Sequence, residues 1–406
     1  MKKTVLSVLS VLLLLCTLLS SCTGANTPDT GTTEKTEAPT QAPTPPVSQE
    51  PAKLQINGVD ISQYTIIYAE SEFVDVMAFI GSQFDYGKVT ATRLSDLIFE
   101  RFGVRLETKC DANTAVSQYE ILVGKTNREE SKIPQINRLA IDNYLVKLNG
   151  DKLLICGGAH GTTYHAVDSL ETWFSTTVEN NLYNITSVTR LSGTYHLKRI
   201  ACIGDSITAG ATATDRNLYS YPAYLGRMYW QEGVVYQYGI SSKTMRDDLA
   251  DSYMKTSEWT NCLANTEKYD AVLIMLGTND SNRDQQWTTA DDDAFKSSCR
   301  TLCSKLKQHS PNAELVIMNC PVNYKTTNFG SLQVRNLQAI MVNALKQDGY
   351  KIHLYDMFNY SRLEMGSSMF PDDLHPTNRG YAKMAYAIHT MLGHLFAGET
   401  SQYLLN

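Results

Sequence analysis

Several features that mark particular protein classes are missing from this 406-residue sequence. The net charge of -6 gives no basic footprint of the kind that nucleic-acid binders carry, and it disfavours a polyanionic substrate. No set of four cysteines or histidines has the spacing of a zinc site and no His-Glu-x-x-His segment occurs, so a zinc protease is disfavoured. No Gly-x-Ser-x-Gly elbow is present either, which disfavours the α/β-hydrolase fold.

Long apolar runs are also scarce, and the one at residues 5–19 is too short to span a membrane comfortably. Two lysines precede it, as in a secretory signal peptide, so residues 1–21 are predicted to be a signal. Leu19-Ser20-Ser21-Cys22 then resembles a bacterial lipobox, which implies that Cys22 is lipidated and anchors the protein to a membrane. A plain secretory signal with an incidental cysteine is the alternative. Both interpretations place the mature protein outside the cytoplasm.

Residues 22–53 are rich in Thr, Pro, Ala and Glu and show no apolar period, which predicts a disordered tether. Seven further cysteines lie beyond this segment. Their odd number leaves at least one thiol free unless chains pair, and several fall in apolar runs, which predicts small buried hydrophobes. They are Cys110, Cys156, Cys202, Cys262, Cys299, Cys303 and Cys320.

Residues 54–195 are predicted to form a small α+β domain. Its strands are expected from β-branched, aromatic or apolar runs, and its helices from apolar spacing. Asn149-Gly150 predicts a hairpin turn in which both residues need positive φ. The expected elements are strands at 65–69, 119–123, 144–148 and 153–156, and helices within 73–102 and at 162–174.

Part of this region resembles the small accessory domain that precedes the barrel in α-glucuronidases and hexosaminidases. The resemblance rests on the strand at 119–123, on Gly124-Lys125-Thr126-Asn127-Arg128, on the hairpin and on the closing helix. Gly157-Gly158-Ala159-His160-Gly161 lies between the last strand and that helix. Its spacing differs from the Gly-x-Gly-x-x-Gly of dinucleotide loops and no βαβ unit follows, so nucleotide binding is disfavoured.

Residues 196–406 change character, because apolar runs now alternate with helical patterns. Continuous apolar strands separated by helices imply a parallel sheet that is covered on both faces. In such sheets, functional groups gather at the carboxyl ends of the strands. The expected strands are 200–203, 234–238, 271–276, 315–318 and 352–355, with helices such as 295–308 and 332–346 between them.

Polar segments do follow these runs: Gly204-Asp205-Ser206, Gly239, Gly277-Thr278-Asn279-Asp280, and Asp372-Asp373-Leu374-His375. Together they suit acyl transfer. A serine hydroxyl needs an adjacent base, histidine titrates near working pH, and a carboxylate fixes the imidazole tautomer. Backbone N–H groups and an asparagine amide can bind the oxyanion that forms.

In this order, the four segments resemble the sequence blocks of SGNH (GDSL-type) hydrolases across residues 198–395. The resemblance implies a flavodoxin-like three-layer α/β/α fold and a catalytic triad of Ser206, His375 and Asp372. It also implies an oxyanion hole formed by the Ser206 N–H, the Gly239 N–H and the Asn279 side chain. Ser242 departs from the pattern, since many relatives have a second glycine there.

Each segment also has a plainer interpretation when taken alone. Gly-Asp-Ser is often just a turn, and Gly277-Thr278-Asn279-Asp280 could cap a helix. Physical argument does not choose between Asp372 and Asp373 as the partner of His375, although the family spacing favours Asp372. His353 and His389 fall in strand and helix patterns and are expected to be structural. The mechanism requires no metal and no organic cofactor.

The sequence therefore predicts a serine esterase that works outside the cytoplasm and removes acetyl or similar groups from a glycan. A lipid esterase such as a lysophospholipase is the first alternative, and it needs a long apolar acyl pocket. The second is a non-catalytic, glycan-binding surface protein that has kept the fold. Acylated glycans and the membrane are the expected partners, and nucleic acid is not.

Overall fold

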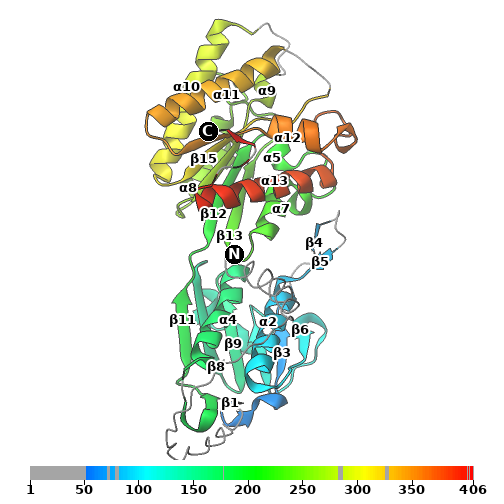
Figure 1. Cartoon of the computed structure of the whole chain (residues 1–406), viewed down its shortest axis with the longest axis vertical. Coiled ribbons are helices and arrows are strands. Elements are labelled where there is room, and N and C mark those ends of the chain that lie inside the picture. The colour runs from blue at the N-terminus through cyan, green and yellow to red at the C-terminus, as the bar shows by residue number, and fades with distance from the viewer. Residues whose placement is uncertain are drawn as a thin grey trace, which may run out of the picture. The chain divides into compact units, whose positions relative to one another are not determined.

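Two six-stranded sheets form the framework of the described part of the chain (Figure 1). The computed structural model describes residues 52–70, 74–77, 82–176, 178–281, 287–324, 329–399, 401 and 403–405. The predicted signal peptide with Cys22 and nearly all of the predicted tether lie outside these residues. The chain passes from the first sheet to the second between Thr194 and Lys198. The predicted domain division at 195–196 falls in this interval and stays a prediction.

The first sheet has the strand order β11-β8-β9-β7-β3-β6. Strands β9, β7, β3 and β6 are parallel to one another, whereas β8 and β11 pair antiparallel at one edge. The strands are β3 (Thr65–Tyr68), β6 (Thr108–Cys110), β7 (Glu120–Val123), β8 (Asn143–Asn149), β9 (Lys152–Gly157) and β11 (Arg190–Thr194). A smaller sheet is formed by β1 (Lys53–Ile56), β2 (Val59–Asp60) and β10 (Leu182–Ile185).

Two helices, α2 (Tyr86–Phe102) and α4 (His160–Phe174), lie side by side against the first sheet (Figure 1). Leu94 and Ile98 of α2 and Val167 and Leu170 of α4 are buried in a core that they share with the strands. Apolar residues three or four apart place one face of each helix on the sheet, which explains why the helical periodicity was informative here.

Two details of the first sheet differ from the sequence prediction. Helical spacing predicted a helix within 73–102. Among the described residues of this range the helix is Tyr86–Phe102, and β4 (Val74–Met77) pairs antiparallel with β5 (Ser82–Phe84). The hairpin between β8 and β9 is present, yet Asn149 pairs with Lys152 and only Gly150, at φ 61, is left-handed. The turn is therefore Gly150-Asp151, one residue later than predicted.

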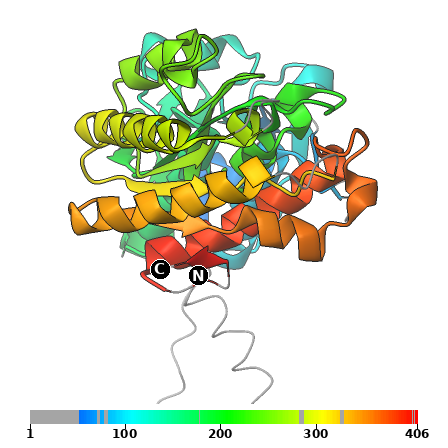
Figure 2. The same cartoon turned by 90° about the horizontal axis from the view of Figure 1, so that it is seen from above.

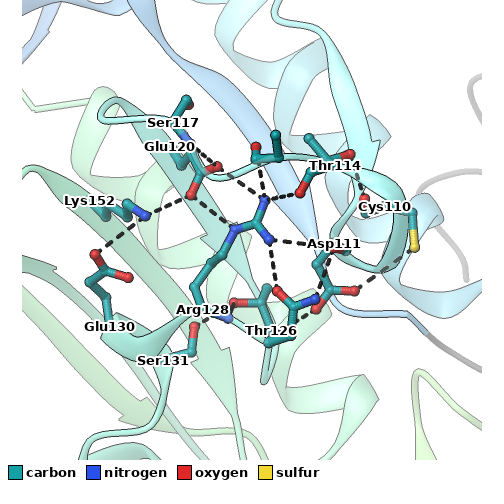
Figure 3. A network of polar contacts seen from close by, with 12 residues as sticks. Cys110, Asp111, Thr114, Ser117, Glu120, Thr126, Arg128, Glu130, Ser131 and Lys152 are labelled. Atoms are coloured by element: carbon teal, nitrogen blue, oxygen red, sulfur yellow. Dashed lines mark hydrogen bonds and ion pairs between the residues drawn. The ribbon is translucent and has the colours of Figure 1, made fainter.

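A network of buried ions lies at the edge of β7 (Figure 3). Glu120 is fully buried, and Arg128 and Lys152 contact its carboxylate at 3.2 Å and 2.9 Å. The guanidinium of Arg128 also donates to the carbonyl oxygen of Thr114 at 2.9 Å. Burial raises the pKa of Glu120, but the hydrogen bonds from Lys152, from the backbone and from Arg128 outweigh it, so the pKa is lowered.

The second sheet has the order β13-β12-β14-β15-β16-β17, with β17 alone antiparallel. Apart from this short last strand, that is the 2-1-3-4-5 order of flavodoxin-like folds, and the predicted fold class is confirmed. The strands are β12 (Lys198–Gly204), β13 (Gly233–Gly239), β14 (Ala271–Met275), β15 (Glu314–Met318), β16 (Ile352–Tyr355) and β17 (Leu404–Leu405).

Helices cover both faces of this sheet, and residues of β12 alternate between the two layers. Ile200 and Cys202 pack with α7 and α13, whereas Ala201 and Ile203 pack on the side of α8, α10 and α11. Figure 2 shows α10 in yellow beside α11 in orange. The helices are α6 (Arg216–Tyr219), α7 (Tyr221–Met228), α8 (Ser257–Ala264), α10 (Thr289–His309), α11 (Phe329–Gln347), α12 (Met357–Glu364) and α13 (Asn378–Ala397).

Candidate active site

The chain turns sharply where β12 ends, and Ser206 lies at this turn. Asp205 caps the short helix α5 (Ser206–Ala209), because its side chain accepts a hydrogen bond from the Ile207 N–H at 3.0 Å. Burial raises the pKa of the Asp205 carboxyl to about 6. Strands β13 and β14 flank β12, so Ser206 lies at the point where the strand order reverses, which is where ligands bind in open α/β sheets.

The imidazole of His375 lies between Ser206 and Asp372. Its Nε2 is 2.8 Å from the Ser206 Oγ, and its Nδ1 is 2.7 Å from an Asp372 oxygen. Ser206 and His375 are 169 residues apart in the chain and meet because the loop before α13 ends over the carboxyl edge of β12. The structure thus brings together the three side chains predicted to form a triad.

Hydrogen bonds hold the carboxyl group of Asp372 in its charged form. Burial raises its pKa, but the bond from the His375 ring and those from the His375 and Leu374 N–H groups outweigh it, and the pKa falls to about 2. A carboxylate at Nδ1 favours the tautomer that carries its proton there. Nε2 is then unprotonated and faces the serine hydroxyl.

Asp373 has a different part in the same loop. Its backbone is left-handed, with φ at 65, its N–H donates to the Phe370 carbonyl, and its own carbonyl accepts from the Tyr324 N–H at 2.8 Å. These bonds shape the loop through the backbone. Of the two neighbouring carboxyl groups, the structure pairs Asp372 with His375.

Asn279 and Asp280 lie in the short helix α9 (Thr278–Ser281), just beyond β14, and both hold a neighbouring loop. The Asn279 side-chain amide donates to the Lys243 carbonyl at 2.9 Å. Asp280 accepts the N–H groups of Met245 and Arg246 at 2.9 Å and 3.1 Å. Burial raises the pKa of Asp280 to about 6. Sequence reasoning gave Asp280 no such role, although its position after Asn279 in the motif was visible.

The direction of the Gly239 N–H group differs from the one that its predicted role in the oxyanion hole requires. Ile240 donates its N–H to the Gly204 carbonyl at 3.1 Å, and this direction alternates along a strand, so the Gly239 N–H points away from β12. A Cβ on Gly239 would collide with the backbone of Thr208 and Ala209, which explains the glycine by packing. This orientation disfavours the predicted donation from Gly239 to an oxyanion.

Ser242 marks the turn that faces Asn279. Its φ of 64 lies in the left-handed region, which favours glycine, and this is the position where the family resemblance leads one to expect a second glycine. The next residue, Lys243, accepts the Asn279 amide. The backbone N–H groups of this turn therefore lie near the Asn279 side chain, in the region where Gly239 was expected to act.

Hydrogen bonds tie the segment after Ser206 to the histidine loop and to α13. The Thr212 hydroxyl donates to the Pro376 carbonyl at 2.7 Å, and the Tyr381 hydroxyl donates to the Ala211 carbonyl at 2.7 Å. Thr212 has a left-handed φ of 68. The sequence gave no signal for these links, because each joins residues that are far apart in the chain and have no motif in common.

Two further properties bear on the site and on the setting of the protein. In the part of the chain that the structure describes, no three His, Cys, Asp or Glu side chains are grouped to hold a metal ion. Within the same residues, no helix combines the length and apolarity that a membrane span needs. The seven cysteines described are all free thiols, and five of them are buried.

Comparison with known proteins finds a similar esterase. An acetylxylan esterase from Xylanibacter ruminicola is 28% identical in an alignment of 211 residues that covers 47% of this chain and 42% of that esterase. The match thus spans less than half of the length of the relative.

Two solved structures cover a similar share of the chain. A family two carbohydrate esterase from Clostridium thermocellum in complex with cellohexaose has 18% identity and a TM-score of 0.40, and the match covers 52% of this chain and 68% of that one. The acetylxylan esterase Axe2 from Geobacillus stearothermophilus has 20% identity and a TM-score of 0.38, with coverage of 48% and 94%. Because both scores are low, we take the fold from this chain's own strand order.

A family model fits the region that holds most of the candidate site. Residues 202–383 match the GDSL-like Lipase/Acylhydrolase family, and this range includes Ser206, Asn279, Asp372 and His375. The strand order of the second sheet and the loops at its carboxyl edge lie in the same region. The second half of the chain is therefore similar, over residues 202–383, to the GDSL-like lipase/acylhydrolase family.

Proposed function

We propose that the protein is a serine esterase that works outside the cytoplasm and removes acetyl or similar small acyl groups from a carbohydrate. The observation that carries the proposal is the continuous hydrogen-bonded chain from Ser206 through His375 to Asp372. The match to an acetylxylan esterase supports a carbohydrate ester as substrate.

In the proposed reaction, His375 Nε2 takes the proton of the Ser206 hydroxyl while Oγ attacks the acyl carbonyl carbon. The imidazolium then gives this proton to the sugar oxygen, which leaves as an alcohol and an acyl-enzyme remains. Water attacks the acyl-enzyme with His375 again as base, and the acid leaves as Ser206 regains its proton. The charged Asp372 stabilises the imidazolium in both steps.

The oxyanion formed in both steps needs N–H donors fixed beforehand. We assign the Ser206 N–H and the Asn279 amide as donors, together with an N–H of the turn at Ser242 and Lys243, in place of Gly239. An amide group has two N–H bonds, and the bond to the Lys243 carbonyl uses one of them and orients the other. Removing one such donor typically costs about 10²–10³-fold in kcat.

The test is release of acetate from acetylated xylan, acetylated peptidoglycan and acetylated sialate by the wild type and by Ser206→Ala. We expect at least one substrate to be cleaved and the variant to lose about 10⁴-fold or more in kcat. Ser304→Ala, at an exposed serine of α10, is the matched control and should keep full activity. Equal rates in Ser206→Ala and wild type contradict the assignment.

Rates on p-nitrophenyl esters of increasing acyl length separate the glycan substrate from a lipid one. The proposal expects the acetyl ester to be the best substrate. A strong preference for long chains points to a lysophospholipase-like lipid esterase instead. Glycan binding without any ester hydrolysis points to a non-catalytic surface protein.

Membrane attachment through Cys22 is a separate part of the proposal, supported by the lysines, the apolar run and the lipobox-like residues of the first 22 positions. Lipid labelling of cells that express the full chain should mark the wild type and leave Cys22→Ala unmarked and released. A labelled Cys22→Ala variant contradicts the anchor without affecting the esterase assignment.

A further inference from the structure

A cavity of about 550 Å³ lies at the end of β13 that is remote from Ser206. Gly233, the first residue of β13, lines it, whereas Gly239 at the other end of the strand pairs with Gly204 beside the serine turn. A seven-residue strand is about 20 Å long at roughly 3.3 Å per residue. The cavity is thus separate from the candidate active site.

Three of the polar side chains that line the cavity each follow one of the parallel strands of the first sheet. Glu70 comes after β3, Lys125 after β7 and His160 after β9. Among the described residues, none makes a hydrogen bond or an ion pair with these three side chains. Carboxyl ends of parallel strands are the usual place for ligands in open sheets, so the three groups are positioned to receive one.

Aromatic rings form one wall of the same cavity. The Tyr86 ring lies 4.9 Å from the His160 ring and 5.0 Å from the Trp230 ring, centroid to centroid. Ligand pockets in proteins commonly combine such an apolar, aromatic surface with a few polar groups that fix orientation. Burial also lowers the pKa of His160, which favours the uncharged imidazole.

The glycines beside His160 are explained by packing and not by a phosphate. A Cβ on Gly158 would collide with the Ala140 carbonyl, and a Cβ on Gly161 with the Trp230 carbonyl. The backbone of both glycines therefore packs directly against neighbouring backbone atoms. The cation of Lys125 is matched by the carboxylate of Glu70, so the lining has no net positive charge to select an anion.

We propose that this cavity binds a pyranose unit of a neutral glycan. The ring's C–H face would lie on Tyr86 and Trp230, because aromatic faces carry negative charge and attract such hydrogens. Glu70 accepts from the sugar hydroxyls and Lys125 donates to them. The inference that the cavity holds the same glycan chain that Ser206 deacylates rests on the proposed function. The binding of a sugar in the cavity does not depend on that function.

The experiment measures calorimetric binding of unacetylated xylohexaose, cellohexaose and mannohexaose to the full chain carrying Ser206→Ala. We expect one of them to bind, and Glu70→Gln or Lys125→Met to weaken it by about tenfold, the effect of losing a hydrogen bond to a charged group. Lys305→Met, at an exposed lysine of α10, is the matched control and should leave binding unchanged. Thermal unfolding checks that all variants are folded.

With Ser206 intact, the two cavity variants should hydrolyse p-nitrophenyl acetate at the wild-type rate and show a raised KM on the acetylated polymer. No binding of any hexasaccharide overturns the proposal, as does binding that is equal in all variants. Displacement of the sugar by inorganic phosphate or ATP also overturns it, in favour of an anion site. Failure of the esterase proposal shows separately, as loss of acetate release with sugar binding retained.

Discussion

The two sheets each carry a polar cluster at one strand, and the clusters differ in what surrounds them. Around Glu120, the cations Arg128 and Lys152 are almost completely buried, and the exposed part of the network is Glu130, the outer partner of Lys152 (Figure 3). Around Ser206, His375 and Asp372 stay partly exposed, at 18% and 37% of their side-chain surface. Buried charges stabilise the fold, whereas a partly exposed chain of hydrogen bonds leaves room for a substrate.

Buried carboxyl groups sharpen the same contrast. Glu120 has two cations within ion-pair distance and its pKa is lowered despite its burial. Asp205 and Asp280 are buried and form no salt bridge with a cation among the described residues, and burial raises the pKa of each to about 6. Hydrogen-bonded cations thus favour the charged form of Glu120, while burial favours the protonated form of the carboxyl groups next to the candidate active site.

The largest expected effect lies at the carboxylate behind His375. Asp372→Ala should lower kcat/KM by about 10⁴-fold, because the imidazole loses both its tautomer and the stabilisation of its charged form. Asp373→Ala, which keeps the backbone bonds that this residue makes, should lose less than about tenfold. Steady-state kinetics on p-nitrophenyl acetate measures both. The opposite ranking contradicts the assigned triad.

The next effect is on stability and lies in the first sheet. Arg128→Ala leaves the Glu120 carboxylate buried with one cation fewer, and breaking such a pair typically costs about 3–5 kcal/mol. Urea unfolding monitored by circular dichroism measures this loss, and the folded fraction should keep its kcat. A matched exposed pair, tested by Arg300→Ala, should change the free energy of unfolding by less than about 1 kcal/mol. Equal losses in the two variants contradict the contrast.

The smallest effect concerns pH. The pKa of Asp205 rises from 3.8 to about 6 on folding, so between these values the folded chain binds more protons than the unfolded chain. The contribution of Asp205 to stability therefore falls as pH rises from about 4 to about 6, by about 3 kcal/mol in all. In Asp205→Asn, which keeps the oxygen that caps Ile207, this decrease in the free energy of unfolding between about pH 4 and about pH 6 should be missing. An equal decrease in the variant and the wild type, measured by urea unfolding at both pH values, contradicts the prediction.

Some strands could be predicted because a strand that is buried on both faces consists of apolar residues throughout. Ala271-Val272-Leu273-Ile274-Met275 is apolar throughout because β14 is covered on both faces, and the expected and observed strands agree. The short edge strand β17 gave no such signal, since two residues show no period. The error before Tyr86 arose because apolar spacing at 74–84 is compatible with a hairpin as well as a helix.

The site shows the same division. Ser206 and Asn279 could be named because each lies just beyond a strand. Asp372 and His375 are separated from β16 by α12, and the family resemblance identified them. Gly239 was assigned a role that depends on which way an N–H points, and alternation along β13 decides that only once its pairing with β12 is known. The grouping of Glu70, Lys125 and His160 was beyond prediction for a related reason, because it depends on the order of three strands.

The proposed nucleophile and its proposed base lie far apart in the chain. The hydroxyl comes from position 206 and the imidazole from position 375, and the helix α13 that follows also contacts the segment after Ser206. A nascent chain, or a chain truncated before residue 375, therefore carries the serine without its proposed base. If the proposed function holds, we expect ester hydrolysis only after synthesis has passed this position.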